Sequence, residues 1–212
     1  MEKGAALAFF DFDGTMIPGD SIVPFLYFAW RRGDMGLFAL LQACGKGLRF
    51  KMGFGSGGEM KRAAFSFYQE LDAEKRQALD KAFAEKIVKK VYSKARATLS
   101  MHKKAGRRAV LVSASTENYM RYVAEMLGVD GLLCTPVDED GHVGENCHGA
   151  EKVRRIEAWM AAQKLPVDLS ASYAYGDSRG DLPMLRLCGH GTLVNAKASL
   201  KKAAPDLMTE EW

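Results

Sequence analysis

The sequence has few cysteines and no long uninterrupted apolar run. Only 4 of its 212 residues are cysteines, they form no CxxC pair, and the first ten residues show no secretory pattern. We therefore expect free thiols in a reducing, cytoplasmic setting rather than a disulfide framework. The apolar segments 22–30 and 36–41 are separated by charged residues, and neither reaches the roughly 20 residues that cross a bilayer. A transmembrane span is therefore excluded.

Basic residues outnumber acidic residues between positions 18 and 98. Residues 18–98 carry a net charge of +7, whereas the rest of the chain carries −3. The basic residues either solvate exposed helix faces or attract an anionic substrate. The better candidates for substrate contact are Arg49, Lys51, Lys61 and Arg62. Because no aromatic stacking platform is interleaved with the basic residues, we expect no nucleic-acid partner.

A pair of carboxylates follows the first β-prone run. Residues 5–10 are apolar and lead into Asp11, Phe12 and Asp13. Side chains alternate along an extended backbone, so both carboxylates lie on one side and Phe12 points into the core. Two like charges this close repel each other unless a cation or a proton lies between them. The pair is either a solvated acidic turn or a catalytic pair at the carboxyl end of a strand.

Two further apolar runs end in polar residues. Residues 108–112 lead into Ser113, and residues 171–175 lead into a segment that contains Asp177 and Asp181. Each run is typical of a strand with polar residues at its carboxyl end.

A helical pattern begins between these runs and contains Lys152 in its first turn. A cation at a helix N-terminus interacts unfavourably with the helix dipole. We therefore expect Lys152 to face an anion.

Four motifs in this order carry a family resemblance. The motifs DFDGT (11–15), VSAS (112–115), the helix-start lysine and GDSRGDLPML (176–185) resemble the haloacid dehalogenase superfamily of phosphotransferases. Their spacing is similar to that of its phosphoserine-phosphatase-like branch, subfamily IB, over nearly the whole chain. The resemblance implies an α/β fold, with a Rossmann-like three-layer α/β/α core, a parallel central sheet and an inserted helical cap of the C1 type.

The expected domain division follows from the helical patterns. We expect residues 1–17 and 97–212 to form the catalytic core and residues 18–96 to form the helical cap. This insert shows no alternating strand. Its helical patterns cover 21–32, 35–50, 59–71 and a long stretch from residue 73, with Asp72 as the expected N-cap.

Residue types and resemblance agree on phosphoryl-transfer chemistry. A carboxylate attacks a phosphate monoester only if a divalent cation and fixed donors neutralise the developing charge. We expect Asp11 to be the nucleophile that forms an aspartyl-phosphate, and Asp13 to be the general acid and base. The expected cofactor is Mg²⁺, held by Asp11, Asp177 and the backbone carbonyl of Asp13, because hard oxygen ligands suit this ion.

The remaining motif residues have supporting roles in this hypothesis. Ser113 and the backbone N–H of Ala114 are expected to hold the phosphate, and Lys152 to offset its charge. Asp181 is expected to lie behind the metal or to orient Lys152. The predicted activity is that of a phosphomonoesterase. The competing class, a non-catalytic phospho-ligand-binding scaffold, would be favoured if a core motif residue were missing, and none is.

Two departures from the family pattern leave the identity of the substrate open. Gly180 stands where relatives of phosphoserine phosphatase usually carry Asn, and Asp20 stands where they carry a substrate-recognising Glu. We expect Asp20, Arg49 and Arg62 to contact the substrate. Phosphoserine and a lipid phosphate similar to phosphatidylglycerophosphate are the two alternatives. The apolar segment 22–30 either packs within the cap, forms a homodimer contact, or docks peripherally on a lipid surface.

Overall fold

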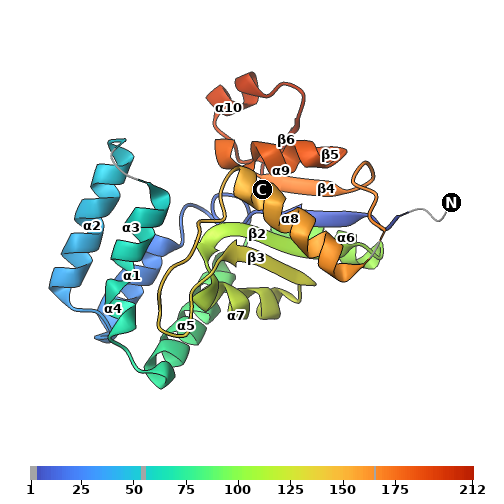
Figure 1. The fold of residues 1–212 in the computed structure, drawn as a ribbon. Helices are drawn as coiled ribbons and strands as arrows, with labels where there is room; N and C mark the ends of the chain where they lie inside the picture. Colours follow the sequence, from blue (N-terminus) through green and yellow to red (C-terminus); the bar gives the residue numbers. More distant parts are fainter. Residues whose placement is uncertain (1–3, 54–55, 165) are drawn as a thin grey trace.

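A parallel sheet, six-stranded in the part of the chain that the structure describes, forms the centre of the molecule (Figure 1). The computed structural model describes residues 4–53, 56–164 and 166–212, apart from the side chains of residues 48–51 and 60. The strand order is β3-β2-β1-β4-β5-β6, and each neighbouring pair is parallel. The strands are β1 (Leu7–Phe10), β2 (Arg108–Thr116), β3 (Gly131–Thr135), β4 (Tyr173–Gly176), β5 (His190–Val194) and β6 (Met208–Glu210).

The helices fall into two groups along the chain. Those between β1 and β2 are α1 (Ile22–Arg32), α2 (Leu37–Lys51), α3 (Gly57–Ala64), α4 (Ser66–Gln69), α5 (Ala73–Ile87), the 3-10 helix η1 (Val88–Lys90) and α6 (Ser93–Lys104). Those that follow β2 are α7 (Glu117–Leu127), α8 (Ala150–Gln163), the 3-10 helix η2 (Arg179–Asp181), α9 (Leu182–Leu187) and α10 (Ala198–Ala203). No helix among the described residues combines the length and the apolar character needed to cross a bilayer.

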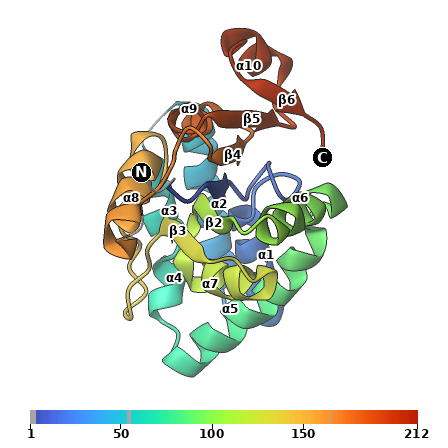
Figure 2. The ribbon, with the colours of Figure 1, turned by 90° about the vertical axis from the view of Figure 1, so that its right-hand side faces the viewer.

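Strand β1 is buried on both of its faces. Its four residues are all apolar and fully buried, as expected for a central strand of a parallel sheet covered on both sides. Leu7 and Phe9 belong to the buried cluster shared with α8 and α9, whereas Ala8 and Phe10 belong to the cluster shared with α5 and α7. Figure 2 shows α8 on one side of the sheet and α6 on the other. The three-layer α/β/α prediction is therefore confirmed.

The helical patterns before β2 correspond to helices, with one difference. Asp72 is the N-cap of α5, because its side chain accepts from the backbone N–H of Lys75. The predicted helix over 59–71 is instead two helices, which meet at Phe65. Phe65 and Phe67 are both buried. In one continuous helix their side chains would point about 200° apart, so the break allows both to reach the core.

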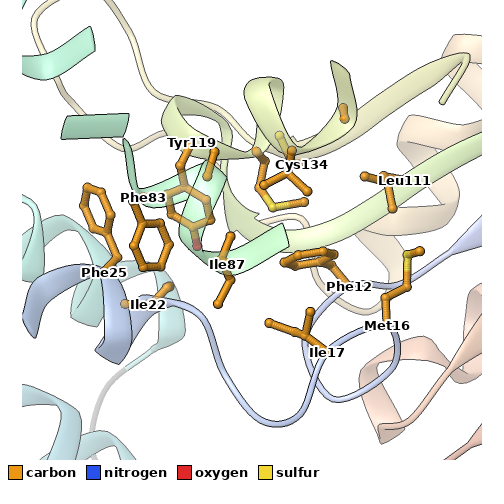
Figure 3. Close-up of a cluster of buried hydrophobic side chains, with 14 of the residues drawn as sticks. Phe12, Met16, Ile17, Ile22, Phe25, Phe83, Ile87, Leu111, Tyr119 and Cys134 are labelled. Carbon is orange, nitrogen blue, oxygen red and sulfur yellow. The ribbon is translucent and has the colours of Figure 1, made fainter. Parts of the chain in front are cut away.

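One buried cluster joins the sheet to the helices that lie beyond its strand ends (Figure 3). The ring centroid of Phe25 in α1 lies 5.2 Å from that of Phe83 in α5 and 5.2 Å from that of Tyr119 in α7. Phe83 and Tyr119 are 5.1 Å apart. The same cluster contains Phe12, which separates the two carboxylates of the first motif, and Leu111 of β2. Packing of α1 and α5 therefore depends on the same core as the sheet.

Because the core is shared, removing one aromatic ring from it should strongly reduce the free energy of unfolding. Phe83→Ala should lower the free energy of unfolding by about 3–5 kcal/mol, because it empties the space between Phe25 and Tyr119. Urea unfolding measures the loss. Glu85→Ala, an exposed position on the same helix, is the matched control and should change the free energy by less than about 0.5 kcal/mol. Similar losses in the two variants would contradict the packing described here.

Candidate active site

The first and last motifs meet at the carboxyl ends of β1 and β4. These strands are neighbours in the sheet, and the pairing continues past Phe10, because the Asp11 N–H donates to the Tyr175 carbonyl at 2.9 Å. Asp177 follows Tyr175 by two residues. Since the carboxyl ends of parallel strands meet at one edge of the sheet, the two carboxylates come together there.

Two glycines allow the carboxylates to approach the backbone closely. Gly14 has φ +76°, and a Cβ there would lie 2.3 Å from Oδ2 of Asp177. A Cβ at Gly176 would lie 2.5 Å from the Cβ of Asp181. A side chain at either position would push the adjacent aspartate out of place.

Lys152 is buried between carboxylates from two motifs. Its Nζ donates to Oδ1 of Asp11 at 2.5 Å, to Oδ1 of Asp181 at 2.6 Å and to the carbonyl of Val112 at 2.8 Å. The prediction that this first-turn lysine faces an anion is confirmed. Burial disfavours its charge, but Asp11 and Asp181 overcome this effect and raise the pKa of Lys152 above its usual value. All three ammonium protons are therefore held by protein oxygens.

The carboxylates outnumber the cations at this point. Asp11, Asp177 and Asp181 each offer an oxygen, and these oxygens lie within 4.8 Å of one another. Among the described residues, only Lys152 forms ion pairs with the cluster. Burial and the Asp181 carboxylate raise the pKa of Asp11, and the same two causes raise the pKa of Asp177 to about 6. The Thr15 hydroxyl lies 3.2 Å from Asp11 Oδ2 and 3.2 Å from Asp177 Oδ1.

Asp13 lies in a different environment, in which hydroxyl groups hydrogen-bond to only one of its two carboxylate oxygens. Its Oδ2 accepts from the hydroxyls of Ser21, at 3.0 Å, and Ser115. Its Oδ1 is buried and has no hydrogen-bond partner in the described part of the chain. Burial, with a smaller contribution from the Asp20 charge, raises the pKa of Asp13 to about 7. A carboxyl group with this pKa can both give and take a proton near neutral pH.

The second motif forms a bulge in β2. Ser113 pairs with Cys134, but the next register pair is Thr116 with Thr135, so Ala114 and Ser115 leave the ladder. The Ser113 hydroxyl accepts from the backbone N–H of Ser115 at 3.1 Å. Bulges beside functional sites redirect the backbone and side chains of the strand. Here the bulge turns Ser115 toward Asp13, and Ser113 and Ala114 line the same pocket as the carboxylates.

A second lysine reaches the site from α3. Lys61 is 5% exposed, and its Nζ donates to the Ala114 carbonyl and, at 2.5 Å, to Oδ1 of Asn146. The Thr135 hydroxyl donates to the same carbonyl at 2.7 Å. Burial lowers the pKa of Lys61 to about 8, although Asp13 opposes this effect. Helix α3 thus places a buried cation against the bulge of β2.

The predicted substrate contacts Asp20 and Arg62 differ from Lys61 in their position relative to the pocket. Asp20 lines the pocket, but its Oδ1 accepts from the backbone N–H groups of Ile22 and Val23 at the start of α1. Arg62 is exposed and is not among the pocket-lining residues that the structure describes, because it projects about 100° away from Lys61 on α3. The side chain of Arg49 lies outside the described part.

The pocket has a volume of about 270 Å³. It is lined by Asp11, Asp13, Gly14, Gly19, Asp20, Ser113, Ala114, His148, Lys152, Asp177, Ser178 and Asp181. Sequence reasoning missed Ser21, Ser115, Asn146 and His148. The second serine of VSAS was a signal for Ser115, whereas the other three belong to no motif. They reach the site only through the packing of α1 and of the segment before α8.

Comparisons with known proteins agree with this geometry. A family model described as haloacid dehalogenase-like hydrolase matches residues 8–186. A probable phosphatase of Mycobacterium tuberculosis is 30% identical over 211 residues, which cover 95% of this chain and 73% of that protein. A phosphoserine phosphatase of the same organism is 30% identical over 215 residues, covering 94% and 68%. A crystal structure of a Bordetella pertussis protein of unknown function has a TM-score of 0.87 at 23% identity and covers 98% of both chains.

The buried lysine predicts a pH-dependent loss of stability. Lys152→Met leaves two buried carboxylates without their cation, so it should lower the free energy of unfolding by about 3–5 kcal/mol near pH 8. In the variant, the folded-state pKa values of Asp11 and Asp181 rise above their unfolded values. Stability is then retained at low pH and lost as the pH rises through the raised pKa values, so the loss should be smaller near pH 5.

Urea unfolding at both pH values tests this prediction. Arg154→Met, which removes an exposed cation from the same helix, is the control and should cost at most about 1 kcal/mol at either pH. A Lys152→Met loss that is the same at both pH values would rule out the buried carboxylates as its cause.

Proposed function

Because this chain belongs to the haloacid dehalogenase-like hydrolase family and is a phosphatase within it, we propose that it hydrolyses a phosphate monoester with Mg²⁺ through an aspartyl-phosphate on Asp11. The observation that carries the proposal is the carboxylate cluster at the strand ends, where Asp11 and Asp181 share the ammonium of Lys152 and Asp177 adds a third carboxylate close to them. A scaffold that only binds a phosphorylated ligand has no need for this excess of buried negative charge.

The donor set fits a divalent cation. Three carboxylates and one ammonium leave a formal excess of two negative charges, and the oxygens lie within 4.8 Å of one another. Asp11, Asp177 and the backbone carbonyl of Asp13 would hold the ion, while Asp181 is bonded to Lys152 and Ser178. When bound, Mg²⁺ supplies positive charge that reduces the repulsion between the nucleophile and the phosphate.

The first half of the reaction uses both carboxylates of the first motif. The Asp11 carboxylate attacks phosphorus, the bond from phosphorus to the alcohol oxygen breaks, and Asp13 gives its proton to that oxygen. In the second half, the Asp13 carboxylate takes a proton from the water that attacks the aspartyl-phosphate. Inorganic phosphate leaves and Asp11 is restored. The Ser21 and Ser115 hydroxyls orient Asp13 for both transfers.

The phosphoryl group would be bound from two sides. We assign the Ser113 hydroxyl and the backbone N–H of Ala114 to its oxygens, with the Lys152 ammonium offsetting charge at Asp11. Lys61 adds a second cation beside Ala114. We assign residues 18–96 to a helical cap over the core, and Lys61 is a cation of this cap that contacts Ala114, one of the residues that line the pocket.

The substrate remains a choice between two phosphate esters. A relative is described as a phosphoserine phosphatase, so a phosphorylated amino acid is the first candidate. A lipid phosphate is the second, because α1 and α2 expose large apolar side chains, with Phe38 74% exposed. Among the described side chains of these two helices, the exposed large apolar residues are Val23, Tyr27, Leu37, Phe38 and Leu41. They would serve peripheral docking on a lipid surface or a homodimer contact.

The state of the cysteines supports a cytoplasmic location. All four are free, and burial raises the pKa of the Cys134, Cys147 and Cys188 thiols. Thiols of this kind are unreactive and need no oxidising compartment.

If Asp13 is the general acid, the rate lost on its substitution should depend on the leaving group of the substrate. Asp13→Asn should slow the hydrolysis of alkyl phosphates by about 10²–10⁴-fold, because the alkoxide leaves without a proton. p-Nitrophenolate is a stable anion that leaves without a proton, so the rate of p-nitrophenyl phosphate hydrolysis should decrease much less. Steady-state kcat/KM for the two substrate types provides the measurement. Equal losses on both would argue against Asp13 as the acid.

The metal assignment predicts a loss of Mg²⁺ binding in Asp177→Asn. In the parent, Mg²⁺ binding to the folded state should raise the midpoint of thermal unfolding, and the shift should be much smaller in the variant. Asp206→Asn is the matched control, because Asp206 pairs with Arg186 on the surface. If Asp177→Asn kept the full Mg²⁺-induced shift, Asp177 would not be a ligand.

Lys61 predicts a pH-dependent KM. Lys61→Ala should raise KM about tenfold or more, since hydrogen bonds to charged groups contribute about 1.5–3 kcal/mol. Arg62→Ala, its neighbour on α3, should leave KM nearly unchanged. Because the pKa of Lys61 is about 8, its charge is lost as the pH rises through that value. KM of the parent should therefore increase above pH 8, whereas KM of Lys61→Ala should not; matching profiles would remove Lys61 from the site.

A further inference from the structure

His148 lines the candidate active site but has no role in the proposed reaction. It lies four residues before Lys152, at the end of the segment that leads into α8. Its side chain lines the same pocket as Asp11 and Asp177. Within the described part of the chain, its backbone N–H donates to the Asn146 carbonyl at 2.8 Å, and its ring nitrogens bond to no protein group.

The ring occupies space that a side chain at residue 180 would fill. A Cβ on Gly180 would lie 2.3 Å from Nε2 of His148, 2.7 Å from Cδ2 and 2.8 Å from Cε1. These three ring atoms are the nearest heavy atoms to that position. The φ of Gly180 lies outside the left-handed region, so its backbone does not require glycine. A side chain at residue 180 would instead displace the His148 ring from its position.

The segment that carries the ring is held on both sides. Oδ1 of Asn146 accepts from Lys61 at 2.5 Å and lies 3.1 Å from the hydroxyl oxygen of Thr135. Cys147 is buried, and its backbone N–H donates to the same hydroxyl at 3.1 Å. His148 follows directly, so its Cα position is fixed by β3, by α3 and by the start of α8.

Two of the charged groups around the ring, Lys152 and Asp181, also lie beside the nucleophile. Lys152, Asp181 and Lys61 are the charged residues that act on His148. Asp13 is not among these residues, and its carboxylate is held by Ser21 and Ser115. The ring therefore lies next to Gly180 and near the Lys152–Asp181 pair beside the nucleophile.

We propose that His148 is a substrate-contacting residue whose ring N–H donates to an oxygen of the bound phosphoryl group, and that Gly180 is required because it leaves room for this ring. The inference rests on the proposed phosphatase function and adds a residue to it. The two lysines near the ring supply charge, and a ring N–H supplies a directed hydrogen bond. The same contact would hold the phosphate product.

A double-mutant cycle tests this proposal. The four proteins are the parent, His148→Ala, Gly180→Ala and the double variant. The measured quantities are kcat and KM for p-nitrophenyl phosphate, and the inhibition constant of inorganic phosphate, all with Mg²⁺. Each single variant should raise KM and the inhibition constant about tenfold or more, as expected for a hydrogen bond to a charged group, with a smaller change in kcat. The double variant should be no worse than His148→Ala, because Gly180→Ala acts only by displacing the ring.

Two results would overturn the proposal. One is an inhibition constant and a KM that stay within about twofold of the parent in His148→Ala. The other is a Gly180→Ala effect that is as large in the His148→Ala background as in the parent. Thermal unfolding of each variant identifies a folding defect. His148 is exposed, so His148→Ala should fold. If Gly180→Ala does not fold, the comparison of His148→Ala with the parent is sufficient to test the proposal. A parent without any activity on p-nitrophenyl phosphate would instead contradict the proposed function.

Discussion

The buried ammonium of Lys152 is the interaction on which the site depends. Without it, Asp11 and Asp181 would face each other as uncompensated charges beneath the surface, at a cost of several kcal/mol. With it, both are positioned, yet the cluster with Asp177 still carries more negative than positive charge. That remaining excess is the physical reason to expect a divalent cation. With such a cation bound, the repulsion between the Asp11 carboxylate and an incoming phosphate would be reduced.

The pocket is assembled from segments that are distant in the sequence but adjacent at the strand ends. The parallel sheet places the ends of β1, β2 and β4 next to one another, and the cluster of buried aromatic rings ties α1 and α5 to that sheet. Ser21, at the start of α1, can therefore hold Asp13, and Lys61, on α3, can bond to the bulge of β2. The helices before β2 and the strand ends therefore share one set of contacts.

Sequence reasoning reached the parts of the site that lie within motifs at strand ends. Asp11, Asp177 and Lys152 could be placed because strand periodicity and the helix-start position fix where their side chains point. Arg62 illustrates the limit, since choosing between it and Lys61 requires the rotation of α3, which a one-residue shift changes by about 100°. The helix predicted over 59–71 also missed the break at Phe65, which arises from long-range packing of aromatic rings. Ser21, Asn146 and His148 have no local signal, because only tertiary packing brings them to the carboxylates.

The aspartyl-phosphate on Asp11 is the central claim, and chemical trapping tests it most directly. The enzyme is mixed with Mg²⁺ and p-nitrophenyl phosphate, quenched in acid during turnover, reduced with borohydride and digested for peptide mass spectrometry. Reduction converts an acyl phosphate, but not a free carboxylate, to an alcohol. The account predicts homoserine at residue 11 in the substrate-treated sample alone, with Asp13, Asp177 and Asp181 unchanged. Homoserine at one of those three positions, or none at all from an enzyme that is turning over, would contradict it.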